Sequence, residues 1–473
     1  MFSSEGEKVT SRKVTKIVES TKNALRNESV SVSFQEAIGD LLDLVTVLVN
    51  QVGLNSSNSS KPPSSDPYRP RRTTRRSSGK KRKSGAQPGH KGSRLLPSEK
   101  PDVIEQILVD QSTLPAGRYE HVSFESRQVF DIEVSFKVTE YQAEILRNKK
   151  GIEFIADFPV GVTEKTQYGN AVKATSVYMS QHQLIPQARV SDLFKSQFGL
   201  SISIGSVNNF NFLAAKKLED LKFESWLKSK LLASKVLHAD ETGINVGGDN
   251  YWIHCLCNGE YTFFFAHKKR GTEAMDMMNV LPYFKGLLVH DHWKPYFTYI
   301  CKHILCNAHH RRELERAFEQ DGQVWALKMK SFLDKLNKSV TDAGGVLPDK
   351  EILRYRKRYQ KILSLANKEC PENLKQRAQS KSRNLLERLL VFEEETLRFM
   401  ENENAPFTNN QGERDLRMTK VQQKISGCFR SMKAAQNFCL IRSYLSTCRK
   451  HGLSPMDALQ ILFCGKLPEF MSA

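Results

Sequence analysis

The sequence predicts a mixed α/β protein that carries a long, nearly all-helical segment. Apolar runs at 231–248, 251–259, 261–267 and 286–291 have the length and the aromatic or β-branched content of strands. A helical pattern at 271–284 precedes the last run, so we expect a mixed sheet. From about 309 to 403 the pattern is almost wholly helical. One apolar stripe of that segment consists of Trp325, Met329, Phe332 and Leu336.

Length and charge limit the possible functions. The chain has 473 residues, enough for several domains, and a net charge of +19 with a pI near 9.4. Residues 67–98 hold eleven Lys or Arg and no acid, which is more than half of the excess charge. Such a distribution favours a polyanionic partner.

Cysteine positions and hydropathy indicate the compartment. All nine cysteines lie at Cys255 or beyond, without a regular pairing pattern, and no apolar leader opens the sequence. No run of about 18 apolar residues is present, so no membrane span is predicted. We therefore expect a reduced, cytoplasmic protein.

The N-terminal region combines a helix with a basic linker. Apolar residues recur at spacings of three and four over 33–53, which predicts a short oligomerising coiled coil; a helix docked on its own domain is the alternative. Residues 54–98 are rich in Ser, Asn, Pro and cations, which predicts a disordered linker that binds DNA phosphates. The seam consists of Phe34, Ile38, Leu41, Val45, Leu48 and Val52. The linker cations are Arg71, Arg72, Arg75, Arg76, Lys80, Lys81, Arg82 and Lys83.

Two further segments precede the predicted sheet. Residues 100–165 contain an alternating run, Phe130 to Val138, which predicts a half-buried strand in a small β-rich module. Residues 169–222 show two helical patterns separated by Gly199. This arrangement is compatible with helix-turn-helix reading of DNA, and a plain helical hairpin fits equally well.

Two predicted strands end in acids. Side chains alternate along a strand, so Asp240 lies on the face of His238 while Glu241 lies on the opposite face, and only one of the two acids can enter a given site. We choose Asp240, because a solvent contact or a structural hydrogen bond would explain Glu241. The run "GLLVHD" ends likewise at Asp291. A carboxylate at the end of a buried strand needs a cation, and a divalent metal would serve.

A third acid, Glu413, lies in the predicted helix that begins near 409. Met418, Val421 and Ile425 would form its inward stripe, whereas Glu413 shares another face with basic residues; an ordinary surface Glu–Arg pair is the alternative. Three carboxylates suit Mg²⁺ or Mn²⁺, and two such ions would support phosphodiester displacement. The basic residues assigned to DNA contact on this face are Arg417, Lys420 and Lys424.

The cluster "CKHILCNAHHRREL" raises the question of zinc. Its Cys and His spacing matches no compact zinc site, and "HILC" predicts a strand followed by a helix that begins near His309 and His310. We expect no structural zinc, and we assign Arg311 and Arg312 to phosphate contact instead.

The order of "LHADETG", "VHDHWKPY", "LCNAHHRREL" and "NNQGERDLR", with a C-terminal "GCFRSMKAAQNFCLIRSYLSTCRKHGLSPMDAL", resembles the insertion sequence 66 family of DDE transposases. The "NSSNSSKPPSSD" and "GAQPGHKG" stretches resemble the N-terminal half of that family, so the resemblance covers nearly the whole chain from about residue 35.

This resemblance implies an RNase H-like catalytic core with two Asp and one Glu around paired Mg²⁺ ions. The family positions fall on Asp240, Asp291 and Glu413. It implies a core over 231–430 with an all-helical insertion at about 309–403, followed by C-terminal helices over 431–473. Double-stranded DNA, further copies of the chain and small companion proteins would be the partners, in the bacterial nucleoid.

One departure from the family concerns residues 100–165. Family members usually carry a cysteine-based zinc ribbon there, whereas this chain has no cysteine before Cys255. We interpret the module as a metal-free remnant. Three functions stay open at this stage: a transposase that cuts and joins DNA, an RNase H-like nuclease that only cuts, and a catalytically inactive DNA-binding relic or regulator.

Overall fold

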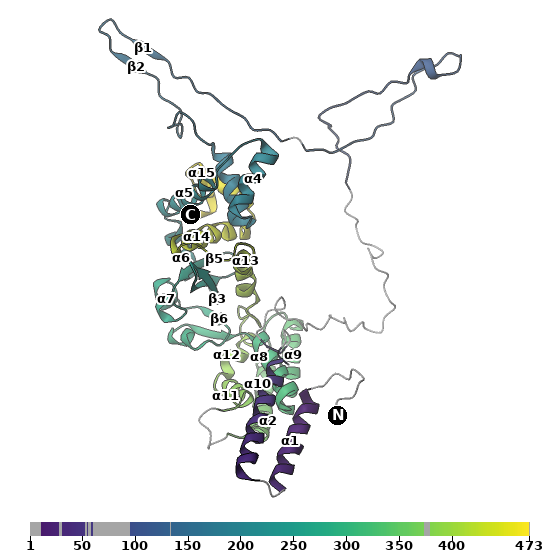
Figure 1. Cartoon of the computed structure of the whole chain (residues 1–473), viewed down its shortest axis with the longest axis vertical. Coiled ribbons are helices and arrows are strands. Elements are labelled where there is room, and N and C mark those ends of the chain that lie inside the picture. The colour runs from purple at the N-terminus through teal and green to yellow at the C-terminus, as the bar shows by residue number, and fades with distance from the viewer. Residues whose placement is uncertain are drawn as a thin grey trace.

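The computed structural model describes residues 11–27, 31–52, 54, 58–59, 95–132, 134–372 and 379–472. Figure 1 shows the central sheet between two groups of helices, with the N-terminal helical hairpin beside the group formed by the helical segment. The predicted linker cations at 71–83 lie outside the described residues.

The sheet has five strands in the order β5-β4-β3-β6-β7. β3 (Val236–Val246) pairs antiparallel with β4 (Asp249–Cys257), which pairs antiparallel with β5 (Thr262–His267). On its other side β3 pairs in parallel with β6 (Leu287–His290), and β6 pairs in parallel with β7 (Lys302–Leu305). Helix α7 (Thr272–Met277) lies in the connection to β6. The predicted mixed sheet is therefore confirmed.

Helices cover both faces of this sheet. Leu237 and Ala239 of β3 belong to one buried cluster with α3 (Asn170–Val177), α5 (Ile204–Asp220), α6 (Phe223–Leu232), α14 (Met432–Lys450) and α15 (Pro455–Phe463). Val236 packs against a different cluster, built with the helical segment. The opposite directions of Val236 and Leu237 confirm the face alternation predicted for β3.

The long helical segment contains α8 (Asn307–Asp321), α9 (Val324–Asp342), α10 (Asp349–Glu369), α11 (Lys381–Val391) and α12 (Glu393–Leu397). The four residues of the predicted stripe from Trp325 to Leu336 are fully buried within it. Because β7 leads directly into α8, the first turn of this segment lies at the end of a sheet strand. The prediction of a strand followed by a helix at "HILCNAHH" is thus confirmed.

The two helical patterns around Gly199 correspond to α4 (Gln187–Phe198) and α5. Gly199 ends α4 with a φ of 65°, a left-handed conformation that glycine adopts without strain. The Ser203 hydroxyl then accepts a hydrogen bond from the Ser206 N–H and caps α5. A π-helical turn, Tyr178–His182, joins α3 to this pair. The helix pair is confirmed, and its use in DNA reading stays a prediction.

The segment before α3 corrects one sequence prediction. Within the described residues of 95–165, the only strands are the short β1 (Ile145–Arg147) and β2 (Glu153–Ile155), which pair antiparallel. The half-buried strand predicted from Phe130 to Val138 is wrong, since Phe130 and Val138 are exposed and no partner strand lies beside them. A segment with an alternating pattern forms a β-strand only where a neighbouring strand can pair with it. Figure 1 shows that this segment extends away from the rest of the protein.

The N-terminal helices form a hairpin of α1 (Ser11–Asn27) and α2 (Val32–Val52), and α1 also contacts α8. Phe34, Leu41 and Leu48 are exposed on α2, whereas Ile38 and Val45 are half-buried. The predicted helix is therefore confirmed, while the coiled coil stays a prediction. Among the described helices, none is long and apolar enough to cross a membrane.

Candidate active site at Asp240, Asp291 and Glu413

Asp240 and Asp291 lie at matching positions on neighbouring strands. His238 of β3 is opposite Val289 of β6 in the parallel register, and each aspartate follows two residues later. Asp240 is still within β3, and Asp291 comes directly after β6. Their matching positions on parallel neighbours bring these two predicted site residues together at the sheet edge where β6 ends. The prediction that the first strand ends at its acids is wrong, because β3 stays paired with β4 through Asp240 and Glu241 and continues to Val246.

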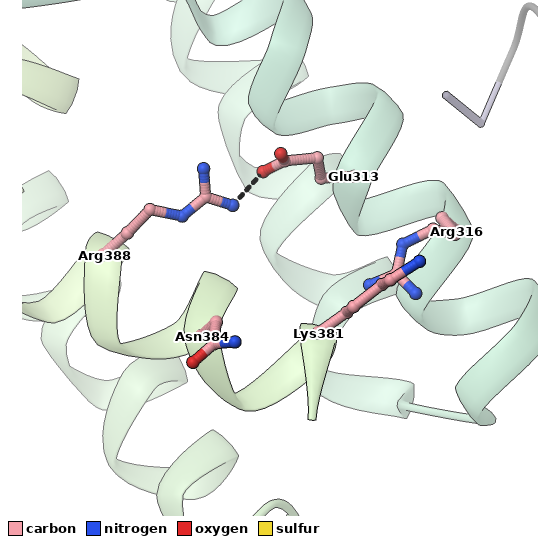
Figure 2. A pocket seen from close by; sticks show the side chains of 5 residues that line it. All are labelled: Glu313, Arg316, Lys381, Asn384 and Arg388. Atoms are coloured by element: carbon pink, nitrogen blue, oxygen red, sulfur yellow. Dashed lines mark hydrogen bonds and ion pairs between the residues drawn. The ribbon is translucent and has the colours of Figure 1, made fainter. Parts of the chain in front are cut away.

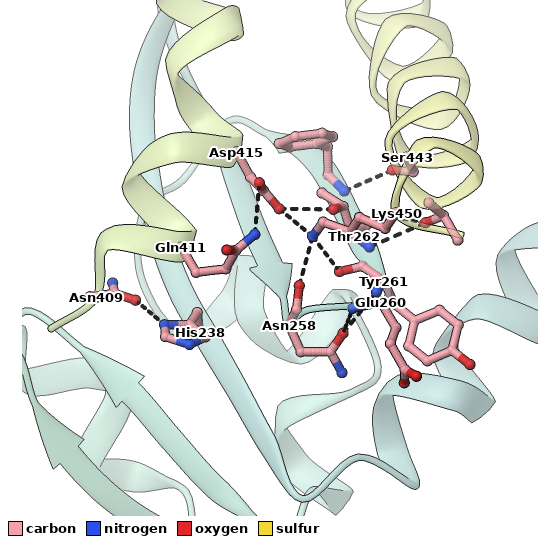
Figure 3. Close-up of polar contacts among 12 residues, drawn as sticks. His238, Asn258, Glu260, Tyr261, Thr262, Asn409, Gln411, Asp415, Ser443 and Lys450 are labelled. Carbon is pink, nitrogen blue, oxygen red and sulfur yellow. Dashed lines mark hydrogen bonds and ion pairs between the residues drawn. The ribbon is translucent and has the colours of Figure 1, made fainter. Parts of the chain in front are cut away.

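Helix α13 (Asn410–Ser426) begins against this edge, held by the residue that precedes it. The Asn409 amide Oδ1 lies 2.8 Å from His238 Nδ1 (Figure 3). Its Nδ2 donates to the Ala239 carbonyl at 2.8 Å. The Asn409 backbone N–H also donates to Cys306 Sγ at 3.1 Å. Asn409 thereby ties the start of α13 to β3 and to the residue after β7.

Gly412 allows α13 to approach Asp240 closely. A Cβ atom on Gly412 would lie 3.4 Å from the Asp240 Cβ and 3.1 Å from the Asn409 Oδ1. Little space for a side chain exists at this point. The next residue along the helix is Glu413, so the third predicted site residue also comes to the edge that carries Asp240.

The charges of these acids are coupled. Burial raises the pKa of Asp240 well above its usual value, and the negative charges of Glu241, Asp291 and Glu413 raise it further. The one hydrogen bond to its side chain comes from the Glu241 N–H, at 2.9 Å, among the described contacts. A buried carboxylate with other carboxylates beside it stays ionised only if a cation is close.

The negative charge of the Glu413 carboxylate is also only partly compensated by its neighbours. Its Oε1 is buried and accepts no hydrogen bond from any described residue. Arg312 Nη2 is 3.6 Å away and His309 Nδ1 is 3.9 Å away, both longer than a hydrogen bond. An oxygen-rich donor set with an unsatisfied buried atom fits a hard divalent cation such as Mg²⁺ or Mn²⁺.

Glu241 points to the other face, as predicted. Its carboxylate accepts hydrogen bonds from Arg270 and from the Tyr296 hydroxyl, and its side chain is 2% exposed. The Arg270 guanidinium lies between Trp252 and Trp293, 4.9 and 4.1 Å from their ring centres. Burial and the charge of Asp291 raise the pKa of Glu241. The structural hydrogen bond predicted for Glu241 is confirmed, and the solvent contact is wrong.

The basic residues assigned to DNA occupy different surroundings. Arg311 forms an ion pair with Asp334, at 2.7 Å, and Arg312 lies beside Glu413. Lys420 donates to the Gly243 carbonyl at 2.8 Å, which fastens α13 to β3. Arg417 and Lys424 are exposed on the same helix. Ile425 was predicted to point inward and is exposed instead, because the buried cluster that receives Met418 and Val421 does not extend to the last turn of α13.

The Cys and His cluster does not converge into one site. His303 faces His290 at 3.1 Å, and His310 faces Asn307. Within the described residues, Cys306, His309 and Glu413 are the group of three whose ligand atoms lie within 4.8 Å of one another, and Asp240 and Asp291 are not part of it. Burial raises the pKa of the Cys306 thiol, which keeps it protonated and a poor ligand.

Several residues of this edge were not found from the sequence. Asn409, Gly412, Arg270 and Tyr296 each act through tertiary contacts. A glycine directly before an acid, and an asparagine four positions before it, within "NNQGERDLR" were the available signal. Their roles depend on which strand α13 approaches, and local spacing does not contain that information.

The site consists of buried acids on a mixed sheet, beside arginines and in a strongly basic chain, an arrangement that suits a protein with a polyanionic partner. Residues 165–437 match the Transposase IS66 family, which is more than half of the chain, and the protein therefore belongs to that family of transposases. Residues 14–95 match a second family, described as a family of unknown function (DUF6444). Among curated proteins, none matches the chain.

Proposed function

We propose that the protein is a DDE transposase of a bacterial insertion sequence, which binds the element's terminal repeats and catalyses metal-dependent cleavage and strand transfer. The observation that carries this proposal is the convergence of Asp240, Asp291 and the start of α13 at one edge of the sheet. Family membership supports an enzyme of nucleotidyl transfer that acts on DNA.

The sheet supports an RNase H-like core within this proposal. Three antiparallel strands are followed by two parallel ones, with one acid within the central strand and one directly after its parallel neighbour. This arrangement suits a site that receives a phosphodiester. The helices between β7 and α13 would then be the insertion into this core.

Asp240, Asp291 and Glu413 would hold the divalent ions, Mg²⁺ or Mn²⁺. When bound, these ions supply activation of the attacking oxygen and stabilisation of the leaving oxygen. Asn409 and Gly412 would fix the position of the start of α13 relative to β3. They would therefore set the distance of Glu413 from the two aspartates. Arg312 would neutralise Glu413 and face the DNA phosphate.

Other parts of the chain would supply binding. The basic linker would contact DNA backbone without sequence preference, and α4 with α5 would read the element ends.

The exposed apolar stripe of α2 would join copies of the chain. Leu41→Glu should therefore sediment as a monomer under conditions in which the wild type associates. Companion proteins of the element would complete the assembly.

The test uses Glu413→Gln, with Glu403→Gln as the matched control because Glu403 is exposed and lies outside the site. DNA that carries the element ends is incubated with the full chain and Mg²⁺ or Mn²⁺, and nicked and joined products are measured. Glu413→Gln should lose both products by orders of magnitude and still bind the ends, whereas the control should match wild type. Asp240→Asn and Asp291→Asn should behave like Glu413→Gln.

Other outcomes assign other functions. Wild type that binds the ends but never nicks them would be a regulator. Wild type that nicks without joining would be a nuclease. Full activity of Glu413→Gln would mean that another acid completes the site, and Glu241 would be tested next.

A further inference from the structure

A basic cavity lies between α8 and α11, outside the acid site (Figure 2). Its lining contains three cations, one acid and one amide. The cations are Arg316, Lys381 and Arg388, and the other two residues are Glu313 and Asn384. Lys381 extends from α11 toward Arg316 on α8 in Figure 2, while Arg388 meets Glu313 on the other side.

The three cations differ in whether a carboxylate forms an ion pair with them. Arg388 forms an ion pair with Glu313, and Arg316 Nη1 is 3.4 Å from Asp321 Oδ2. Lys381 is exposed, and no described carboxylate forms an ion pair with it. The cavity therefore keeps an excess of positive charge at Lys381.

The position of Lys381 does not serve the stability of its helix. It is the first residue of α11, whose first turn has no acid, and the Ser380 hydroxyl already caps the Arg383 N–H. A cation at a helix N-terminus opposes the helix dipole, and an anion there is favoured. Lys381 and the start of α11 together therefore suit a bound anion better than an empty cavity.

The cavity is close to the acid site along α8. Arg312, beside Glu413, and Arg316 are one helical turn apart, about 6 Å along the axis, which is roughly the rise of two nucleotides in duplex DNA. The cation Arg316 of the cavity thus lies on the same helix as the arginine beside Glu413, one turn away.

We propose that this cavity binds a backbone phosphate of DNA a few nucleotides from the phosphodiester held at Asp240, Asp291 and Glu413. The inference rests on the proposed function for the placement of that phosphodiester. Glu313 holds Arg388 in the free protein and releases it when the phosphate enters, so the carboxylate competes with DNA for the same guanidinium.

The test measures binding of the full chain to a random-sequence DNA duplex in EDTA, across a range of salt concentrations. Lys381→Ala should weaken binding about three- to tenfold and reduce the log–log salt slope by about one. Glu313→Gln should tighten binding, since it frees Arg388. Lys338→Ala, an exposed lysine on α9 outside the cavity, is the control and should change the slope less.

Thermal unfolding separates these effects from damage to the fold. Lys381→Ala should melt at the wild-type temperature or slightly above it, because it removes a cation from a helix N-terminus. Equal slopes for wild type, Lys381→Ala and Lys338→Ala, or weaker binding by Glu313→Gln, would overturn the inference. Since EDTA removes any metal-dependent reaction, this result does not depend on whether the acid site cuts DNA.

Discussion

Asn409 and His238 are 171 residues apart in sequence, and their side chains meet with Oδ1 2.8 Å from Nδ1. Burial lowers the pKa of His238, so the ring is neutral at pH 7. The Asn409 Nδ2 donates to the Ala239 carbonyl, which directs Oδ1 toward the ring, and the histidine proton therefore lies on Nδ1. This pair fixes the beginning of α13 on the strand that carries Asp240.

The first prediction removes that connection. Asn409→Ala leaves the buried His238 N–H and Ala239 carbonyl without partners, so unfolding free energy should fall by about 1–3 kcal/mol. Cleavage should fall further than stability alone explains, because Glu413 loses its fixed position. Denaturant unfolding and DNA nicking measure the two effects. Asn404→Ala, whose amide bonds the exposed Glu403, should change neither; equal effects of both variants would contradict the positioning role.

The second prediction concerns the close approach at Gly412. Gly412→Ala adds a Cβ 3.1 Å from Asn409 Oδ1 and 3.4 Å from the Asp240 Cβ, so α13 must shift by a few tenths of an ångström. We expect about tenfold slower DNA cleavage with little change in DNA affinity, since misplacing a reacting group costs rate.

The control for this variant is Gly259→Ala, because an added Cβ there meets no atom within 4 Å. Melting temperatures of both variants should stay close to wild type. Unchanged cleavage by Gly412→Ala would show that the start of α13 tolerates displacement, and Glu413 would then not need its present distance from Asp240.

How far the sequence predicts this site depends on the kind of contact. Asp240 and Asp291 could be found because each follows a short apolar run, a pattern contained in a few consecutive residues, although β3 continues past Asp240 to Val246. Asn409 and Gly412 could not, because their roles arise only when α13 docks on β3. The run from Phe130 to Val138 shows the opposite kind of error, a local pattern that predicts an element which does not form. Its alternation fits a strand, but no strand within the described residues pairs with it.

The third prediction uses the repulsion among the acids. Burial and the neighbouring carboxylates raise the pKa of Asp240, so its charged form destabilises the metal-free fold near neutral pH. Asp240→Asn should therefore melt at a higher temperature than wild type in EDTA. Mg²⁺ or Mn²⁺ should raise the melting temperature of wild type and should not raise that of the variant.

Asp249→Asn provides the comparison, because Asp249 is exposed at the start of β4 and lies away from the acids. It should keep the response of wild type to both ions. If the ions leave wild-type melting unchanged and Asp240→Asn is less stable than wild type, the three carboxylates do not form a cation site.

The last prediction concerns pH. His254 of β4 is buried, and its Nε2 donates to the Lys269 carbonyl at 3.2 Å. Burial, with a smaller contribution from the positive charge of Arg270, lowers its pKa to about 4.

In the unfolded chain this histidine binds a proton with a pKa of about 6.5, so the unfolded chain holds more protons than the folded chain between these two pH values. The contribution to stability is therefore complete above about pH 6.5 and is lost progressively as pH falls toward 4. At pH 5 this histidine alone should lower the unfolding free energy by about 2 kcal/mol relative to pH 8.

His254→Gln keeps an amide donor and does not titrate. Denaturant unfolding at pH 5 and pH 8 should therefore show a smaller difference in unfolding free energy for this variant than for wild type. His121→Gln removes an exposed ring and should keep the wild-type difference; if both variants keep it, another group accounts for the acid sensitivity.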